Sequence, residues 1–276
     1  MKPKNERPDI SVWEHNRGFI RTRKGGWIPG KAVYNHGYSM MDDLIGKTSF
    51  FQVLLLNITG QLPERRLADW FEAVFSCMSY PDARIWCNQI GSLAGTVGAS
   101  PLTGLTAGLL ATDSSMYGVG PFVAGVKFIQ DALVQQKKGL SVDDIVTAHQ
   151  RRPGSKPLIT GYVRPIASGD ERIEVLEQVA AGLGFAAGEH LVLAREIARF
   201  MEEKFNEGMN LNGYMSAFLS DQGFSLQEIL RLVSAIAFAG IQACHAEAAD
   251  NPAGTFFPLQ CEDIDYTGHG ERPVPD

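Results

Sequence analysis

Apolar residues recur at helical spacing along most of this chain. Residues 67–78 hold an apolar set three or four positions apart, which predicts an amphipathic helix. Residues 50–58 follow a Thr48/Ser49 cap, and we expect another helix there. Its expected apolar face holds Phe50, Val53, Leu54 and Ile58. Residues 226–244 are almost entirely apolar, so we expect one long buried helix.

Polar caps and glycine stops divide the remaining sequence into further helices. Ser141 and Ser225 each stand where a helix would begin, and Gly208 stands where one would end. Further helical spacing covers residues 121–134, 172–182 and 189–206. Only residues 21–39, RTRKGGWIPGKAVYNHGYS, read as short strands around glycines, which predicts a small hairpin. The predicted class is all-α with a small N-terminal β hairpin.

Residues 91–108, GSLAGTVGASPLTGLTAG, are unusually rich in small side chains. Small residues let two helix backbones approach closely. We therefore expect a tight helix pair here, at the interface with a second copy of the chain.

Composition narrows the function classes. The chain has 276 residues, 45% of them hydrophobic, and a net charge of −6, with no basic stripe that would suit nucleic acid. The apolar stretches are short or interrupted, and the N-terminus lacks an apolar signal region, so we expect a cytoplasmic protein with no membrane partner. The four cysteines form no CxxC pair, so no metal site or disulfide framework is expected.

One loop stands out as a candidate ligand site. Residues 156–172, KPLITGYVRPIASGDER, place Gly161, Tyr162, Arg164 and Arg172 between helical segments. Gly161 would let the backbone come close to a bound group, and the two arginines would suit an anion. A solvated interdomain loop explains the same composition, and both interpretations remain open here.

Four segments, in order, resemble the citrate synthase superfamily and particularly its citryl-CoA lyase branch, which includes the C-terminal module of ATP-citrate lyase. They are residues 35–63 (NHGYSMMDDLIGKTSFFQVLLLNITGQLP), 105–121 (LTAGLLATDSSMYGVGP), 158–172 (LITGYVRPIASGDER) and 210–213 (NLNG). The resemblance implies a two-domain helical fold, with a large domain from residues 1–118 and 225–276 and a small domain from residues 119–224. It also implies a homodimer or higher homo-oligomer whose cleft closes over coenzyme A, an acyl-CoA and a small carboxylate.

The resemblance also assigns catalytic positions, and this chain departs from the family at several of them. The loop histidine of the family is Arg164 here, and the carboxylate of its "NVDG" segment is Asn212. A slot that is aromatic in the lyase module is Tyr117, and Asn88 falls near a further histidine slot. Arg172 matches the family arginine that binds a substrate carboxylate.

These substitutions change the chemistry that is available. An amide such as Asn212 cannot act as a base, and Arg164 can stabilise an oxyanion but cannot shuttle protons. Tyr117 could donate a hydrogen bond or a proton to an enolate. Three functions therefore stay open: an altered CoA-thioester carbon–carbon lyase or condensing enzyme with His36 or His245 as the base, a decarboxylase-like or retro-Claisen enzyme, and a catalytically silent partner subunit.

The resemblance places coenzyme A beside the loop. Backbone groups of Thr160, Gly161, Tyr162 and Val163 would meet the adenine, and the expected phosphate contacts are Arg151, Arg152 and Lys156. The same basic residues could equally belong to a solvated linker. His36 and His245 are candidate substrate ligands, but a turn position for His36 and a structural position for His245 would also account for them, as a core position would for Tyr117.

Overall fold

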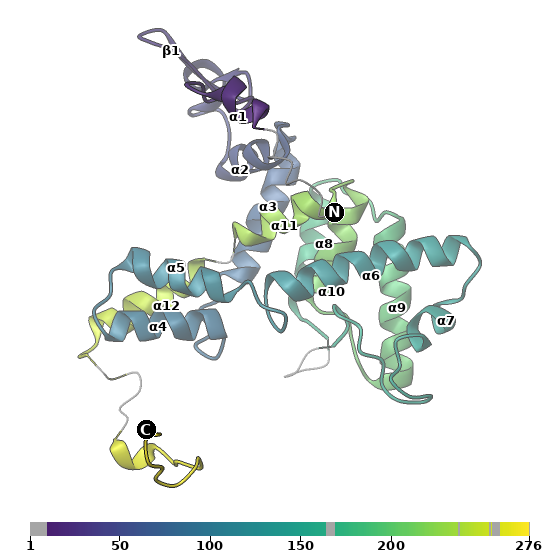
Figure 1. The fold of residues 1–276 in the computed structure, drawn as a ribbon. Coiled ribbons are helices and arrows are strands. Elements are labelled where there is room, and N and C mark those ends of the chain that lie inside the picture. Colours follow the sequence, from purple (N-terminus) through teal and green to yellow (C-terminus); the bar gives the residue numbers. More distant parts are fainter. Residues whose placement is uncertain (1–9, 164–168, 237, 254, 256–259, 276) are drawn as a thin grey trace, which may run out of the picture. The chain divides into compact units, whose positions relative to one another are not determined.

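The computed structural model describes residues 10–275 except 164–168, 237, 254 and 256–259. The chain divides into two compact units, Met1–Glu72 and Ala73–Asp276. Helices make up most of the second unit, and the first unit combines helices with the sheet (Figure 1). The predicted class, all-α with a small N-terminal β element, is confirmed.

The first unit carries a three-stranded antiparallel sheet. Its strands are β1 (Gly25–Ile28), β2 (Ala32–Asn35) and β3 (Tyr38–Ser39), paired in that order. A short helix, α1 (Ser11–Asn16), precedes the sheet, and a π-helical turn, η1 (Met40–Leu44), follows it. All three strands lie within residues 21–39, where the sequence predicted short strands paired in a hairpin or two.

Two helices complete the core of the first unit. Ser49 caps α2 (Phe50–Thr59) in a capping box with Gln52, as the sequence predicted. The predicted buried face is wrong, because α2 buries Phe51, Gln52, Leu55 and Leu56, and Phe50 is exposed. The helix is apolar on both sides, so spacing alone did not select a face. Phe51 stacks on Phe71 of α3 (Arg65–Met78), with ring centroids 6.4 Å apart.

The second unit contains the remaining helices. They are α4 (Trp86–Thr96), α5 (Pro101–Ala111), α6 (Val119–Lys137), α7 (Val142–Thr147), α8 (Arg172–Gly182), α9 (Glu189–Phe205), α10 (Leu211–Asp221), α11 (Leu226–Ser234), α12 (Ala239–Asp250) and the 3-10 turn η2 (Cys261–Asp263). Ser141 and Ser225 form capping boxes at α7 and α11, as predicted. Helix α9 ends at Asn206, which adopts a left-handed conformation, rather than at Gly208.

The single long helix predicted for residues 226–244 is wrong. The structure has two helices instead: α11 ends at Ser234, and α12 begins at Ala239. No glycine or proline separates them in the sequence, so the apolar pattern gave no sign of two helices. By length and composition, Leu226–Asp250 is apolar enough to cross a membrane, but buried core helices pass the same test, and 47% of its apolar 18-residue window is buried.

The small residues of α4 and α5 pack against α12 of the same chain. The three helices lie side by side, and α12 contacts both others (Figure 1). A Cβ added at Gly91 would lie 2.8 Å from the carbonyl oxygen of Ile241, and one added at Gly108 would lie 2.6 Å from the Ile241 side chain. The predicted close approach is thus present within one subunit, and the contact with a second copy stays a prediction.

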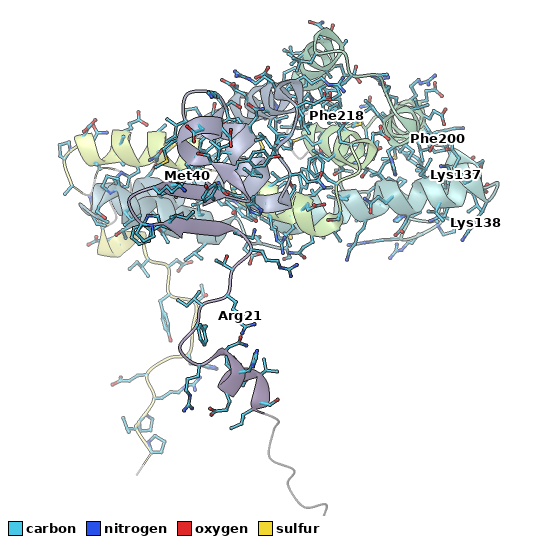
Figure 2. The ribbon with its side chains drawn as sticks, turned by 90° about the horizontal axis from the view of Figure 1, so that it is seen from above. Arg21, Met40, Lys137, Lys138, Phe200 and Phe218 are labelled. Carbon is cyan, nitrogen blue, oxygen red and sulfur yellow. The ribbon has the colours of Figure 1, made fainter. Side chains whose placement is uncertain are left out.

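Helix α6 is the centre of the other helices in this unit. It contacts α7, α9, α10 and α11, and α10 in turn contacts α8. Figure 2 shows Lys137 and Lys138 at the end of α6, where Lys137 forms a 2.7 Å ion pair with Glu189 of α9. Phe218 of α10 meets Phe185 edge to face, with ring centroids 5.3 Å apart. Helices α6 and α10 therefore belong to one packed group of helices.

Candidate functional site

A cavity of about 500 Å³ lies in the second unit. It is enclosed by the segment that leads into α6, the N-terminal turn of α10 and the loop 158–163. The lining residues are Met78, Thr112, Ser115, Met116, Tyr117, Gly118, Val119, Pro121, Phe122, Leu158, Ile159, Thr160, Gly161, Val163, Asn210, Leu211, Asn212, Met215 and Val233. Tyr117, Asn212 and most of the predicted coenzyme A loop thus line one space.

Asn210 holds the loop onto α10. Its backbone N–H donates to the Gly161 carbonyl at 2.8 Å, and its side-chain Nδ2 donates to the Val163 carbonyl at 2.9 Å. Its Oδ1 accepts from the backbone N–H groups of Asn212 at 3.0 Å and Gly213 at 3.3 Å, which caps the helix. One side chain therefore sets the position of the loop relative to α10.

The loop approaches α10 so closely that Gly161 is required. Gly161 has φ +101°, and a Cβ there would lie 2.9 Å from the Gly213 Cα. The neighbouring Tyr162 side chain is fully buried, and its hydroxyl donates to the Ala194 carbonyl at 3.3 Å. Burial raises the Tyr162 pKa above its ordinary value. Only the backbone of residue 162 remains for ligand contact.

The Asn212 side chain is held at both ends. Its Nδ2 donates to the Pro121 carbonyl at 3.0 Å, and its Oδ1 accepts from the Ser216 hydroxyl at 2.9 Å. An aspartate here would turn an acceptor toward the Pro121 carbonyl, which would disfavour its charged form. The surroundings of Asn212 therefore suit an amide.

Tyr117 stands on the wall of the cavity and is 39% exposed. Its ring lies 6.3 Å from that of Trp86, centroid to centroid. Partial burial and then the adjacent Cys87 thiol raise the pKa of Tyr117 to about 12, and the positive charge of Arg172 opposes this shift. The hydroxyl is therefore protonated at neutral pH and acts there as a hydrogen-bond donor.

Arg172 forms its strongest contacts with Asp170. Its Nε and Nη2 donate to the two carboxylate oxygens at 2.8 and 2.6 Å, and its Nη1 donates to the Cys77 carbonyl at 3.3 Å. The Leu211 N–H also donates to Asp170, at 3.1 Å. Burial opposes ionisation of Asp170, but these hydrogen bonds and the Arg172 charge outweigh it, so the pKa of Asp170 lies below its usual value. The Arg172 charge is thus largely matched within the protein.

Three further candidates lie outside the cavity or outside the described residues. Asn88 is buried on α4 and donates to the Asp82 carbonyl at 2.9 Å. His245 is buried on α12, with Nε2 3.0 Å from the Ala99 carbonyl oxygen. Neither side chain lines the cavity. Arg164, the predicted oxyanion group, falls within residues 164–168, which the structure does not describe.

The remaining candidates lie on turns. Arg151 and Arg152 are exposed in the segment after α7. Lys156 forms an ion pair with Glu207, so a phosphate there would compete with a carboxylate. His36 belongs to the first unit, in the turn between β2 and β3, and has φ 48°. Within the described part of the chain, no cluster of three His, Cys, Asp or Glu side chains could hold a metal ion.

The residues that hold the loop in place and form the apolar lining of the cavity were not predicted from the sequence. Asn210 carried a local signal, because an asparagine that begins NLNG before an apolar run is a helix cap. The lining residues Phe122, Met215 and Val233 carried none, since each looks like an ordinary core position.

Comparisons with known proteins agree on the fold. No protein-family model matches the sequence, and no curated protein sequence matches it. A citryl-CoA lyase from Hydrogenobacter thermophilus has a similar structure, with a TM-score of 0.74 and 27% identity over 93% of this chain and 97% of that one.

Two further structures agree. The first is an ATP citrate lyase from Methanothrix soehngenii, in complex with citrate and coenzyme A, with a TM-score of 0.77 and 18% identity. This chain is covered to 97%, but the match spans 45% of that longer protein. A citrate synthase from Thermoplasma acidophilum, in complex with carboxymethyl coenzyme A and oxaloacetate, has a TM-score of 0.59 and 14% identity over 83% of this chain and 59% of that one. This chain therefore has a fold similar to that of solved structures in the citrate synthase superfamily, and it is similar to a citryl-CoA lyase over nearly the full length of both.

Proposed function

We propose that this protein binds an acyl-CoA thioester in the cavity and cleaves or forms a carbon–carbon bond through a thioester enolate. One observation carries the proposal: Tyr117, Asn212 and the loop 158–163 line a single cavity in a chain similar to a citryl-CoA lyase. Coenzyme A acts as the carrier of the substrate, and the mechanism uses no metal.

The thioester carbonyl lies where Tyr117 can donate to it. In the cleavage direction the electrons of the breaking carbon–carbon bond move toward the thioester, and the negative charge collects on its oxygen. A donor that stays protonated, as the raised pKa of Tyr117 ensures, stabilises that oxyanion. The other fragment leaves as CO₂, or as a carboxylic acid once water has added to its carbonyl group. A proton from water then adds to the carbon beside the thioester and gives the shortened acyl-CoA.

The described lining residues favour a step that requires little base catalysis. Among them, Tyr117 is the only side chain that titrates, and at neutral pH it is protonated. Loss of a carboxylate as CO₂ draws its electrons from a carbon–carbon bond rather than from a C–H bond. Retro-Claisen cleavage does the same once water has added to the β-carbonyl. Of the functions that the sequence left open, this one therefore has the most support. Arg164 next to Val163 would add a second cation for the enolate oxygen, and Arg172 would steer a small carboxylate co-substrate.

Coenzyme A would lie along the loop. The backbone of residues 160–163 would contact the adenine, and Arg151, Arg152 and Lys156 would contact the phosphates by charge-assisted hydrogen bonds. We also propose that residues 119–224 form a small domain that closes on a large domain from residues 1–118 and 225–276. The chain would act in the cytoplasm as a homodimer or higher homo-oligomer, with residues 91–108 at the twofold axis.

A catalytically silent, acyl-CoA-binding partner subunit is the second candidate. Its support is the Asn212 side chain, whose amide is engaged at both ends by Pro121 and Ser216. A residue held in that way contributes to packing without taking part in proton transfer. Weak or absent turnover of every thioester that binds would favour this candidate over the first.

Calorimetry with coenzyme A, acetyl-CoA and several dicarboxyl-CoA thioesters tests binding, and mass spectrometry of the same mixtures tests carbon–carbon cleavage. We expect binding by coenzyme A and very weak cleavage of citryl-CoA, because the loop histidine and the carboxylate of the family are both replaced. The double variant Arg164→His, Asn212→Asp should gain citryl-CoA cleavage. If the wild type already cleaves citryl-CoA at ordinary rates and the double variant does no better, the roles assigned to these positions are wrong.

A further inference from the structure

The floor of the cavity is made of apolar core side chains. Those that line it and are at most 8% exposed are Val119, Phe122, Ile159, Leu211, Met215 and Val233. They come from α6, α10, α11 and the loop before Gly161, so tertiary packing fixes the shape of this surface. The polar groups of Tyr117, Thr160 and Asn212 line the same cavity, so one space combines a buried apolar floor with hydrogen-bonding groups.

No side chain with a formal charge at neutral pH lines the cavity among the residues that the structure describes. A carboxylate placed on the apolar floor would lose its hydration and gain no described charged partner, which is strongly unfavourable. Arg172 does not supply a charged partner on the floor itself, because its guanidinium is bound by Asp170 through two hydrogen bonds and does not line the cavity.

We propose that the part of the acyl group that stays on coenzyme A is an uncharged aliphatic chain, and that this chain lies on the floor formed by Phe122, Met215 and Val233. The assignment rests on the function proposed above and names the substrate class of the same cavity. Burial against these side chains would supply the affinity, since each methylene removed from water strengthens binding. The thioester would then lie at the polar part of the cavity, within reach of Tyr117.

Binding of matched thioesters tests this assignment. Calorimetry would compare coenzyme A with its acetyl, propionyl, butyryl and hexanoyl thioesters, and butyryl-CoA with succinyl-CoA, which has the same number of acyl carbons and a terminal carboxylate. We expect affinity to rise about fourfold for each added methylene until the floor is covered, and butyryl-CoA to bind at least about tenfold more tightly than succinyl-CoA.

Three results would count against the assignment in distinguishable ways. Equal affinity for all chain lengths would mean that the pantetheine arm occupies the floor, and tighter binding of succinyl-CoA would mean that the acyl group is charged. Either result overturns this assignment and leaves the proposed function standing. Absence of binding by coenzyme A and by every thioester would overturn both.

Matched variants locate the acyl chain. Met215→Ala enlarges the floor, and we expect it to shift the preferred chain toward hexanoyl by about fourfold or more relative to butyryl. Met201→Ala is the control, because Met201 is equally buried, on α9, and does not line the cavity. Val233→Ile, a change of one methylene, should shorten the preferred chain and serves if Met215→Ala lowers the yield of folded protein. Equal chain-length preference in the wild type and in every folded floor variant would overturn the assignment.

Discussion

Replacement of Asn210 by alanine tests whether one side chain joins the coenzyme A loop to α10. The change removes the acceptor that caps α10 through Asn212 and Gly213, and it removes the donor to the Val163 carbonyl. Loss of an asparagine cap costs about 1 kcal/mol. Loss of the donor, which leaves a partly buried carbonyl without this partner, costs about another 1 kcal/mol. We therefore expect Asn210→Ala to lower the free energy of unfolding by about 2 kcal/mol.

Urea denaturation followed by circular dichroism would measure that difference. Because the chain has two compact units, the change should appear in the transition that reports the larger one. Hydrogen exchange measured by mass spectrometry should show faster exchange in peptides that cover residues 158–163 and 210–213. Peptides from α9 should be unaffected, which separates a local effect from general destabilisation.

Asn210→Asp provides the matched control. Aspartate keeps the cap acceptor and favours the positive end of the α10 dipole, but it loses the donor to Val163. Its stability should therefore lie between that of the wild type and that of Asn210→Ala. If Asn210→Ala changes the free energy of unfolding by less than about 0.5 kcal/mol and leaves exchange of both peptides unchanged, the described contacts do not hold the loop.

Further predictions concern turnover, packing and pH. Tyr117→Phe should lower kcat about a hundredfold with little change in KM, as loss of one oxyanion donor does, and equal kcat in both proteins would remove Tyr117 from the mechanism. Because the pKa of Tyr117 is raised, the folded state holds the phenol proton more tightly than the unfolded state does. The free energy of unfolding should therefore decrease as the pH rises from about 10 to about 12. In Tyr117→Phe, the melting temperature should change less over that pH range. Gly95→Ala would place a methyl group against the His245 backbone, so we expect the free energy of unfolding, measured by thermal melting, to fall by about 1–3 kcal/mol. An unchanged melting temperature would contradict the packing of α4 on α12. The pKa of Asp170 is lowered, so the ionised carboxylate should stabilise the fold fully above the ordinary value of 3.8 and progressively less as the pH falls below it. Acid denaturation of Asp170→Asn should lack this loss of stability. Identical acid denaturation of the two proteins would mean that the pair with Arg172 contributes nothing to stability.

Helix starts and the fold class could be predicted from the amino-acid sequence. Ser49, Ser141 and Ser225 begin helices because a serine followed three residues later by a Gln, Asp or Glu side chain closes a capping box within one turn. The order of the four family-like segments led to the citrate synthase superfamily, which the comparison with a citryl-CoA lyase bears out. The family resemblance also points to Tyr117 and Asn212, and the composition of residues 156–172 points to the loop around Gly161; all three contribute to the lining of one cavity.

Which apolar positions are buried, and what they surround, depends on contacts between distant segments of the chain. Helix α2 is apolar on both sides, and its buried face was set by contact with Phe71, which spacing along the chain cannot encode. The partner of the glycines in α4 and α5 proved to be α12, whose residues lie more than a hundred positions away in the sequence. The cavity floor joins Phe122, Met215 and Val233 in the same way. Periodicity and capping reflect interactions between neighbours in sequence, whereas the shape of a cavity depends on long-range packing that each helix acquires only in the folded chain.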